Sequence, residues 1–120
     1  MPRKDEHVNW AIHDRDFWTS IDLDTSPYTD WAPIGMFYEA LHWVEAFLAT
    51  KGHHYHEHKQ RKWAMRRLYA SELGTIEADY SKLKQDSETA RYDCYKHTPK
   101  EIRQLIPFID TIKKHVSALL

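Results

Sequence analysis

The sequence contains only one cysteine, Cys94, so it cannot form an internal disulfide. A small core without disulfides is typical of a reducing compartment, and we therefore expect a cytoplasmic protein. No apolar run is long enough to cross a membrane, because the most apolar stretch, residues 31–49, is interrupted by three polar side chains. The charged first residues also lack the apolar segment of a signal peptide. Neither secretion nor membrane insertion is expected.

The chain also has little glycine, little proline and almost no net charge. With three glycines and five prolines it contains no flexible linker or low-complexity tract, and its 120 residues fit a single domain over residues 1–120. Its 17 basic and 18 acidic residues give a formal net charge of -1. This balance excludes a protein that holds nucleic acid by a global positive field, so any RNA contact must be local.

What the sequence does contain is apolar residues at three- and four-residue spacing, which predicts helices and no strands. The expected fold class is all-α, an up-and-down bundle of about five helices. The first helix is expected over about residues 5–20. Its inward-facing residues should be Val8, Ile12 and Phe17 or Trp18. The second, about residues 30–51, is apolar on two sides and is therefore expected at the centre of the bundle.

Three further helices follow a histidine-rich segment. The third should place Trp63, Met65, Leu68 and Tyr69 inward. Its other face is basic and carries Lys59, Arg61, Lys62, Arg66 and Arg67. The fourth is expected over about residues 71–92, with a seven-residue repeat that indicates a bundle seam. The fifth begins at the sequence Thr98-Pro-Lys-Glu101, which predicts a capping box.

Two segments of the chain resemble one known family. Residues 30–68, DWAPIGMFYEALHWVEAFLATKGHHYHEHKQRKWAMRRL, are similar to the middle of HEPN-domain proteins, with a helix of the type FYxALHxVxAxL, a glycine, spaced histidines and a basic helix. Residues 79–95, DYSKLKQDSETARYDCY, resemble the family's next helix. The resemblance implies a helical bundle that often forms a homodimer. It also implies a role in RNA or nucleotide chemistry, in some members as a toxin paired with a small nucleotidyltransferase antitoxin.

Catalytic members of the HEPN family cut RNA without a metal through an Arg-x(4 to 6)-His motif shared across the dimer. The resemblance points here to Arg91 and His97 as catalytic residues. A histidine can transfer protons to and from the ribose and leaving oxygens, and a guanidinium can stabilise the phosphorane charge. The alternative is structural: Arg91 would pair with Asp86 or Glu88, and His97 would be an exposed residue that contributes little to packing.

The histidine-rich segment 53–58 is open to three interpretations. Its spacing resembles the family pattern G-x-H-x-x-x-H-x-x-R, which implies an RNA or nucleotide site formed by His54, His58 and Arg61 together with Arg66 and Arg67. The second interpretation is a metal site with His54, His56 and His58 as candidate ligands, although no second ligand pair closes it, and no cofactor is expected. The third is solvated or capping histidines.

On the second expected helix, Tyr38, His42 and Glu45 follow one another at steps of four and three residues. They are therefore expected on one side of that helix, within hydrogen-bonding reach of one another. A polar network between helices is the favoured interpretation, because buried polar groups are normally paired. The large aromatic side chains are expected to belong to the core rather than to stack on bases, namely Trp31, Tyr38, Trp43, Phe47 and Trp63.

The leading hypothesis is therefore a HEPN-type protein that binds RNA or a nucleotide. Its most specific version is a metal-independent endoribonuclease of a toxin–antitoxin or defence system. The alternative is a non-catalytic helical dimerisation or interaction module. An enzyme requires Arg91 and His97 to converge, whereas a binding module needs only the basic face or an exposed apolar patch.

Overall fold

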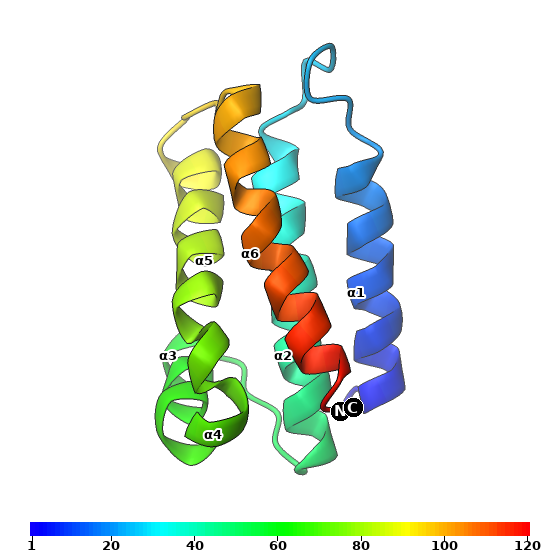
Figure 1. Cartoon of the computed structure of the whole chain (residues 1–120), viewed down its shortest axis with the longest axis vertical. Helices are drawn as coiled ribbons and strands as arrows, with labels where there is room; N and C mark the ends of the chain where they lie inside the picture. The colour runs from blue at the N-terminus through cyan, green and yellow to red at the C-terminus, as the bar shows by residue number, and fades with distance from the viewer.

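A computed structural model describes all residues from 1 to 120 and contains no strand, which confirms the all-α bundle. The long helices run along the long axis of the molecule (Figure 1) and are α1 (Lys4–Thr19), α2 (Trp31–Thr50), α5 (Glu77–Tyr92) and α6 (Pro99–Ser117). Short elements join α2 to α5, namely α3 (His58–Trp63), the π-helical turn η1 (Ala64–Leu68), α4 (Ala70–Leu73) and the 3₁₀ turn η2 (Gly74–Ile76). No helix combines the length and the apolar composition that a membrane crossing requires.

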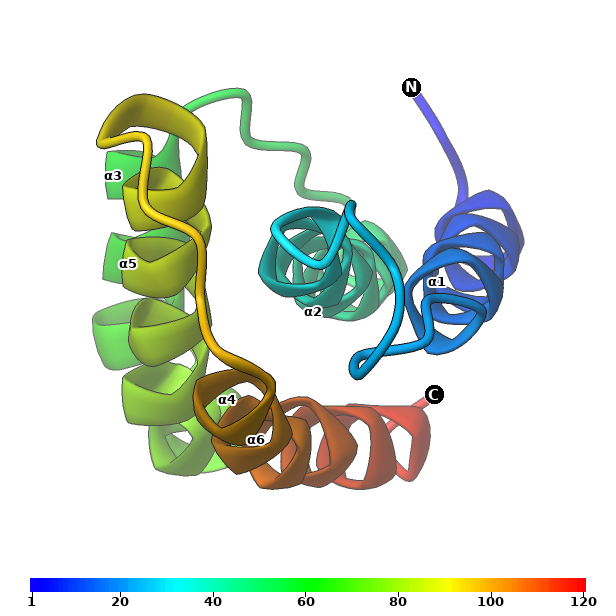
Figure 2. The same ribbon diagram turned by 90° about the horizontal axis from the view of Figure 1, so that it is seen from above.

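Helix α2 lies at the centre of the bundle, as its two apolar faces predict. Viewed from above, α1, α5 and α6 surround it (Figure 2). Every residue from Ala32 to Leu48 is buried except Tyr38, Leu41 and His42. Side chains from both predicted stripes therefore form the core against the neighbouring helices.

Helix α1 is rotated relative to the expectation from its apolar spacing. Its buried residues are His7, Ala11 and Trp18, whereas Ile12 and Phe17 are 47% and 44% exposed. The expected inward register was therefore wrong for Ile12, whereas of the expected pair Phe17 or Trp18 it is Trp18 that is buried. Polar contacts determine the rotation, because the inward face of α1 carries side chains that bond to carboxylates and imidazoles of α2.

Glu39 is the buried polar centre of this α1–α2 contact. Its side chain is fully buried and accepts hydrogen bonds from Arg15 Nε at 3.0 Å, Trp18 Nε1 at 2.7 Å and Trp43 Nε1 at 2.9 Å. Arg15 also donates to Asp110 of α6 at 2.9 Å. The close approach depends on Gly35, since a Cβ there would lie 2.9 Å from Trp18 Cβ. One carboxylate thus fixes how α1 lies on α2.

The chain after α3 differs from the expected pair of continuous helices. The π turn and the 3₁₀ turn interrupt it, so the helix expected from residue 71 is regular only from Glu77. Five of the six expected seam residues are nevertheless buried, at Leu73, Ile76, Tyr80, Leu83 and Ser87, whereas the sixth, Ala90, is only partly buried. The capping box of α6 is confirmed: Thr98 Oγ1 accepts from the Glu101 amide, and Glu101 Oε1 accepts from the Thr98 amide.

Candidate functional site

Arg61 lies inside the protein rather than on the expected basic face. It is only 4% exposed, and its Nε donates to Glu45 Oε1 at 2.5 Å. Its Nη2 donates to the Tyr55 carbonyl at 2.8 Å, and its Nη1 donates to His58 Nδ1 at 3.0 Å. The guanidinium therefore joins the segment after α2 to α2 itself. Its placement on the exposed face of the third helix was wrong, because the buried Glu45 carboxylate requires a cation.

The remaining cations of α3 and η1 surround an exposed tryptophan. Trp63 is 53% exposed and lines a surface hollow of about 260 Å³. The other residues that line the hollow are Lys59, Lys62, Arg66 and Arg67. The core assignment of Trp63 was therefore wrong. The π turn that follows Trp63 is an irregularity of a kind frequent at functional sites. We call these five residues the α3 basic surface.

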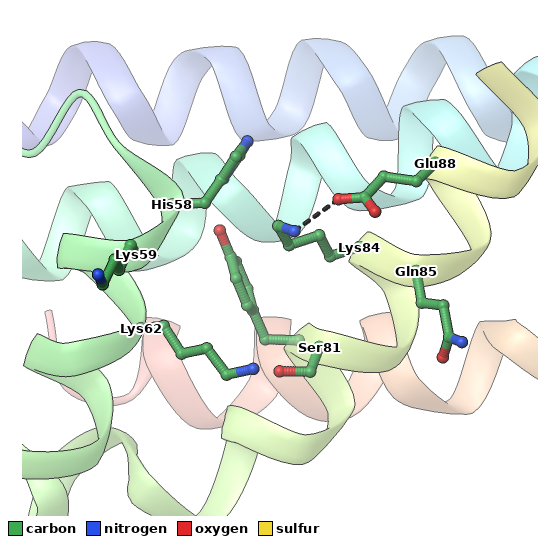
Figure 3. Close-up of a pocket in the computed structure, with 8 residues that line it drawn as sticks. His58, Lys59, Lys62, Ser81, Lys84, Gln85 and Glu88 are labelled. Carbon is green, nitrogen blue, oxygen red and sulfur yellow. Dashed lines mark hydrogen bonds and ion pairs between the residues drawn. The ribbon is translucent and has the colours of Figure 1, made fainter. Parts of the chain in front are cut away.

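A polar pocket of about 600 Å³ opens beside this surface, between α3 and α5 (Figure 3). Figure 3 shows Lys62 extending from α3 toward Ser81 of α5, and Lys84 turned toward Glu88, with 2.5 Å between Lys84 Nζ and Glu88 Oε1. The lining residues are His58, Lys59, Lys62, Tyr80, Ser81, Lys84, Gln85 and Glu88. Cationic and hydroxyl groups thus face one space, which suits an anionic ligand.

The ionisation of the pocket favours hydrogen-bond donation. Burial, followed by the positive charges of Arg61 and Lys84, lowers the pKa of His58, so its imidazole is neutral at pH 7. Because Arg61 donates to Nδ1, the proton of His58 lies on Nε2 and is free to be donated. Burial also raises the pKa of Tyr80 to about 12, so its buried hydroxyl stays protonated. The Nε2 proton of His58 can be donated to an oxygen of a bound anion.

Part of the positive charge is already neutralised by carboxylates. Arg66 Nε lies 2.9 Å from Glu77 Oε1, and Lys62 Nζ lies 3.8 Å from the same oxygen. Arg67 is exposed and forms no ion pair. The Arg66 side chain remains 55% exposed, so an anion from solvent can compete with Glu77 for it.

The two residues of the predicted nuclease motif have different partners. Arg91 donates from Nη1 to the Tyr38 hydroxyl at 3.0 Å and stacks on the rings of Tyr38 and Tyr92. His97 is only 3% exposed, and its Nε2 lies 3.0 Å from Asp86 Oδ1. The expectation of an exposed His97 was wrong, and so was the alternative pairing of Arg91 with Asp86 or Glu88. No contact joins Arg91 to His97 within one chain.

Tyr38, His42 and Glu45 do not hydrogen-bond to one another. Each pairs with a different helix instead: Tyr38 with Arg91 of α5, Glu45 with Arg61 of α3, and His42 with His7 of α1. The distance between His42 Nδ1 and His7 Nδ1 is 3.0 Å. The favoured interpretation, a polar network between helices, agrees with these contacts, whereas the expected bonds within the triad are absent.

The structure separates the members of the histidine-rich segment. His54 turns toward α2, with Nδ1 3.8 Å from Glu45 Oε2, whereas His58 bonds to Arg61. His56 is exposed, and its ring meets that of His54 edge-on at 4.6 Å. His54, His56 and His58 therefore do not form one cluster among themselves. The sequence pattern missed His7, whose ring stacks on that of His54 at 6.3 Å. His7 lies far from this segment in the chain, so no local sequence signal points to the contact.

Asp14 of α1 makes the stability of the folded protein depend on pH in a way that can be measured. Burial is the main cause that raises the pKa of Asp14 from 3.8 to about 6, and Glu39 adds to it, although His13 opposes it. A raised pKa in the folded state means that stability is lost as the pH rises through that value. Asp14→Asn is therefore expected to melt at a higher temperature than the parent at pH 7. Both proteins are measured in chelator, so that adventitious metal does not affect melting.

The difference between Asp14→Asn and the parent should shrink as the pH falls through about 6 and vanish below about 4, where Asp14 is protonated in both states. Calorimetry across this range measures it. Asp16→Asn, an exposed position on the same helix, serves as the matched control and should leave melting unchanged. A constant difference at every pH would contradict this origin.

Comparisons of the chain with protein-family models, with curated proteins and with solved structures give no match.

Proposed function

We propose that this chain binds single-stranded RNA or a nucleotide through the α3 basic surface and the adjoining pocket. The observation that carries the proposal is Trp63, a large aromatic side chain left half-exposed among four cations. What distinguishes Trp63 from the other exposed tryptophans is its place among these cations, where a base can stack on the ring while its phosphates meet the positive charges. The resemblance to HEPN proteins supports the same class of ligand.

Each part of the surface has a role in this proposal. Lys59, Lys62, Arg66 and Arg67 contact phosphates, which needs no global positive charge because the cations are gathered on one face. A base stacks on Trp63, as bases stack on exposed aromatic rings in single-strand-binding proteins. His58 donates to a phosphate or ribose oxygen that enters the pocket. Arg61 and His54 act indirectly, by holding the segment that leads into α3.

Fluorescence anisotropy with a short labelled oligouridine tests the proposal. Affinity should fall as salt rises, because each phosphate contact releases counterions. Trp63→Ala should weaken binding about 5- to 150-fold, the effect of about 1–3 kcal/mol per stacked base, without changing the salt dependence. Arg66→Ala with Arg67→Ala should weaken binding and reduce the slope of log affinity against log salt by about 1.4, or about 0.7 for each lost phosphate contact.

Matched controls lie on other faces of the molecule. Trp10 is also about half exposed, on α1, so Trp10→Ala tests the loss of a tryptophan elsewhere. Lys100→Ala with Lys114→Ala removes the same charge from α6. Both controls should bind RNA like the parent. Equal losses in the control and test variants, or no binding by the parent at low salt, would refute the proposal.

A more specific version of this proposal is that the chain also cleaves the RNA that it binds. It requires Arg91 of one chain and His97 of a partner copy to meet across a symmetric dimer, because the two side chains share no contact within one chain. Gel analysis of the same RNA in chelator, with parent and Arg91→Ala chains, tests it. A small nucleotidyltransferase partner remains a prediction from the resemblance alone.

A second candidate function, homodimerisation or an interaction module, is favoured by a different feature. An apolar hollow of about 650 Å³ lies where α1 ends and α2 begins, with Phe17, Ile21, Tyr28 and Trp31 in its lining. We propose a second copy of this chain as its occupant, since the resemblance implies a homodimer. Light scattering should then give about twice 14.4 kDa for the parent and less for Trp31→Ser.

A further inference from the structure

A second polar cluster lies inside the protein, away from the α3 basic surface. It joins His7 of α1, Glu45 of α2 and His54 of the segment before α3. One ligand atom from each residue lies within 4.8 Å of the other two. His7 is 5% exposed and Glu45 is 2% exposed, so two of the three groups are almost completely withdrawn from water.

Two atoms of this cluster have no hydrogen-bond partner. These are His7 Nε2 and Glu45 Oε2, and both are buried. Leaving a buried nitrogen and a buried carboxylate oxygen unpaired costs free energy, and such groups are rare unless something binds them. Arg61 occupies only Oε1 of Glu45, so Oε2 remains directed toward the two imidazoles, with His54 Nδ1 at 3.8 Å.

The contact between His7 and His42 allows the tautomer of His7 that a metal needs. Their Nδ1 atoms lie 3.0 Å apart, so one of the two rings donates and the other accepts. When His42 carries its proton on Nε2, the nitrogen 3.9 Å from Asp14 Oδ2, His7 donates from Nδ1. The Nε2 atom of His7 then has a free lone pair for a metal. Metal-bound histidines are oriented by this kind of outer hydrogen bond, often leading to a carboxylate.

From this geometry we propose that His7 Nε2, Glu45 Oε2 and His54 bind one divalent transition-metal ion of the Zn²⁺ or Co²⁺ class. Two imidazoles and a carboxylate are a ligand set that suits Zn²⁺, and imidazole disfavours Mg²⁺ and Ca²⁺. Three protein ligands leave one position for water or a substrate atom. The site shares His54 with the segment that leads into α3, so its test measures metal binding alone and not RNA binding.

The three ligand atoms would have to move only a short distance to bind one ion. Three atoms within 4.8 Å of one another place a central ion at most about 2.8 Å from each, against bond lengths of about 2.0–2.2 Å. Each donor must therefore move inward by less than about 1 Å. His54 lies on the segment between α2 and α3, outside any helix, and can supply much of this movement.

Titration of the untagged, chelator-stripped chain with Co²⁺, followed by visible absorption, tests the site. We expect one Co²⁺ per chain, displaced by Zn²⁺ and unaffected by excess Mg²⁺. Loss of a residue that only orients a metal ligand weakens metal binding about 10- to 100-fold. His7→Gln and His54→Ala each remove a ligand itself, so each should weaken Co²⁺ binding by at least that factor. His53→Ala removes a neighbouring imidazole that stacks on Tyr55 instead, and should bind like the parent.

His7→Gln separates this site from simple chelation by the histidine-rich segment 53–58. If that segment alone binds the metal, His7→Gln binds Co²⁺ like the parent, and the proposal is overturned. It is also overturned if the parent does not bind one Co²⁺ per chain. Circular dichroism checks that the variant is folded. Should it not fold, NMR of the parent decides: Co²⁺ must perturb the ring signals of His7 and His54 first, and perturbation of His53, His56 and His58 alone would overturn the proposal.

Discussion

Glu39→Ala is expected to lower the free energy of unfolding by about 3–5 kcal/mol, the cost of removing one partner from a buried ion pair. The variant leaves the Arg15 guanidinium, 21% exposed, without its buried carboxylate. It also leaves the indole N–H groups of Trp18 and Trp43 without acceptors. Urea unfolding followed by circular dichroism measures the loss.

Asp110→Ala is the matched control for Glu39→Ala, because Asp110 binds the same guanidinium from the surface and is 54% exposed. Exposed ion pairs contribute about 0–1 kcal/mol, so this variant should unfold almost like the parent. If the two variants lost the same small amount of stability, Glu39 would not be the group that fixes α1 on α2.

Arg61→Met should be destabilising to a similar extent, about 3–5 kcal/mol in metal-free protein, because it leaves the Glu45 carboxylate buried without a cation. It also removes the donors to the Tyr55 carbonyl and to His58. The double variant Glu45→Gln, Arg61→Met should recover most of this loss, since it removes the buried charge together with its partner. Urea unfolding of the parent, both single variants and the double variant completes the cycle.

The Arg61 cycle also distinguishes a structural role from a binding role. The resemblance to HEPN proteins implies that Arg61 contacts RNA, whereas its burial predicts that it supports α3 from inside. If Arg61→Met kept full stability but lost RNA affinity, the binding role would be correct. Arg67→Ala, on an exposed residue without an ion pair, should show the opposite pattern, with full stability and weaker RNA binding.

The sequence alone determined the features that depend on near neighbours in the chain. The apolar stripes of α2 predicted its central place, the seam of α5 predicted its buried residues, and Thr98 with Glu101 predicted the start of α6. Each of these signals lies within one or two helical turns, where spacing decides which side chains share a face. Gly52 likewise ends α2 with the positive φ that glycine allows.

Only the tertiary structure decided which polar side chains are buried. Spacing rules treat histidine, arginine and glutamate as solvent-facing, yet the rotation of α1 follows from Glu39, and Arg61 is buried because Glu45 needs a cation. Trp63 could not be distinguished from a core residue by its spacing, because apolar periodicity does not show which apolar side chains lie against another helix. His7 meets Glu45 and His54 across gaps of 38 and 47 residues, and a burial that depends on such distant partners has no local sequence signal.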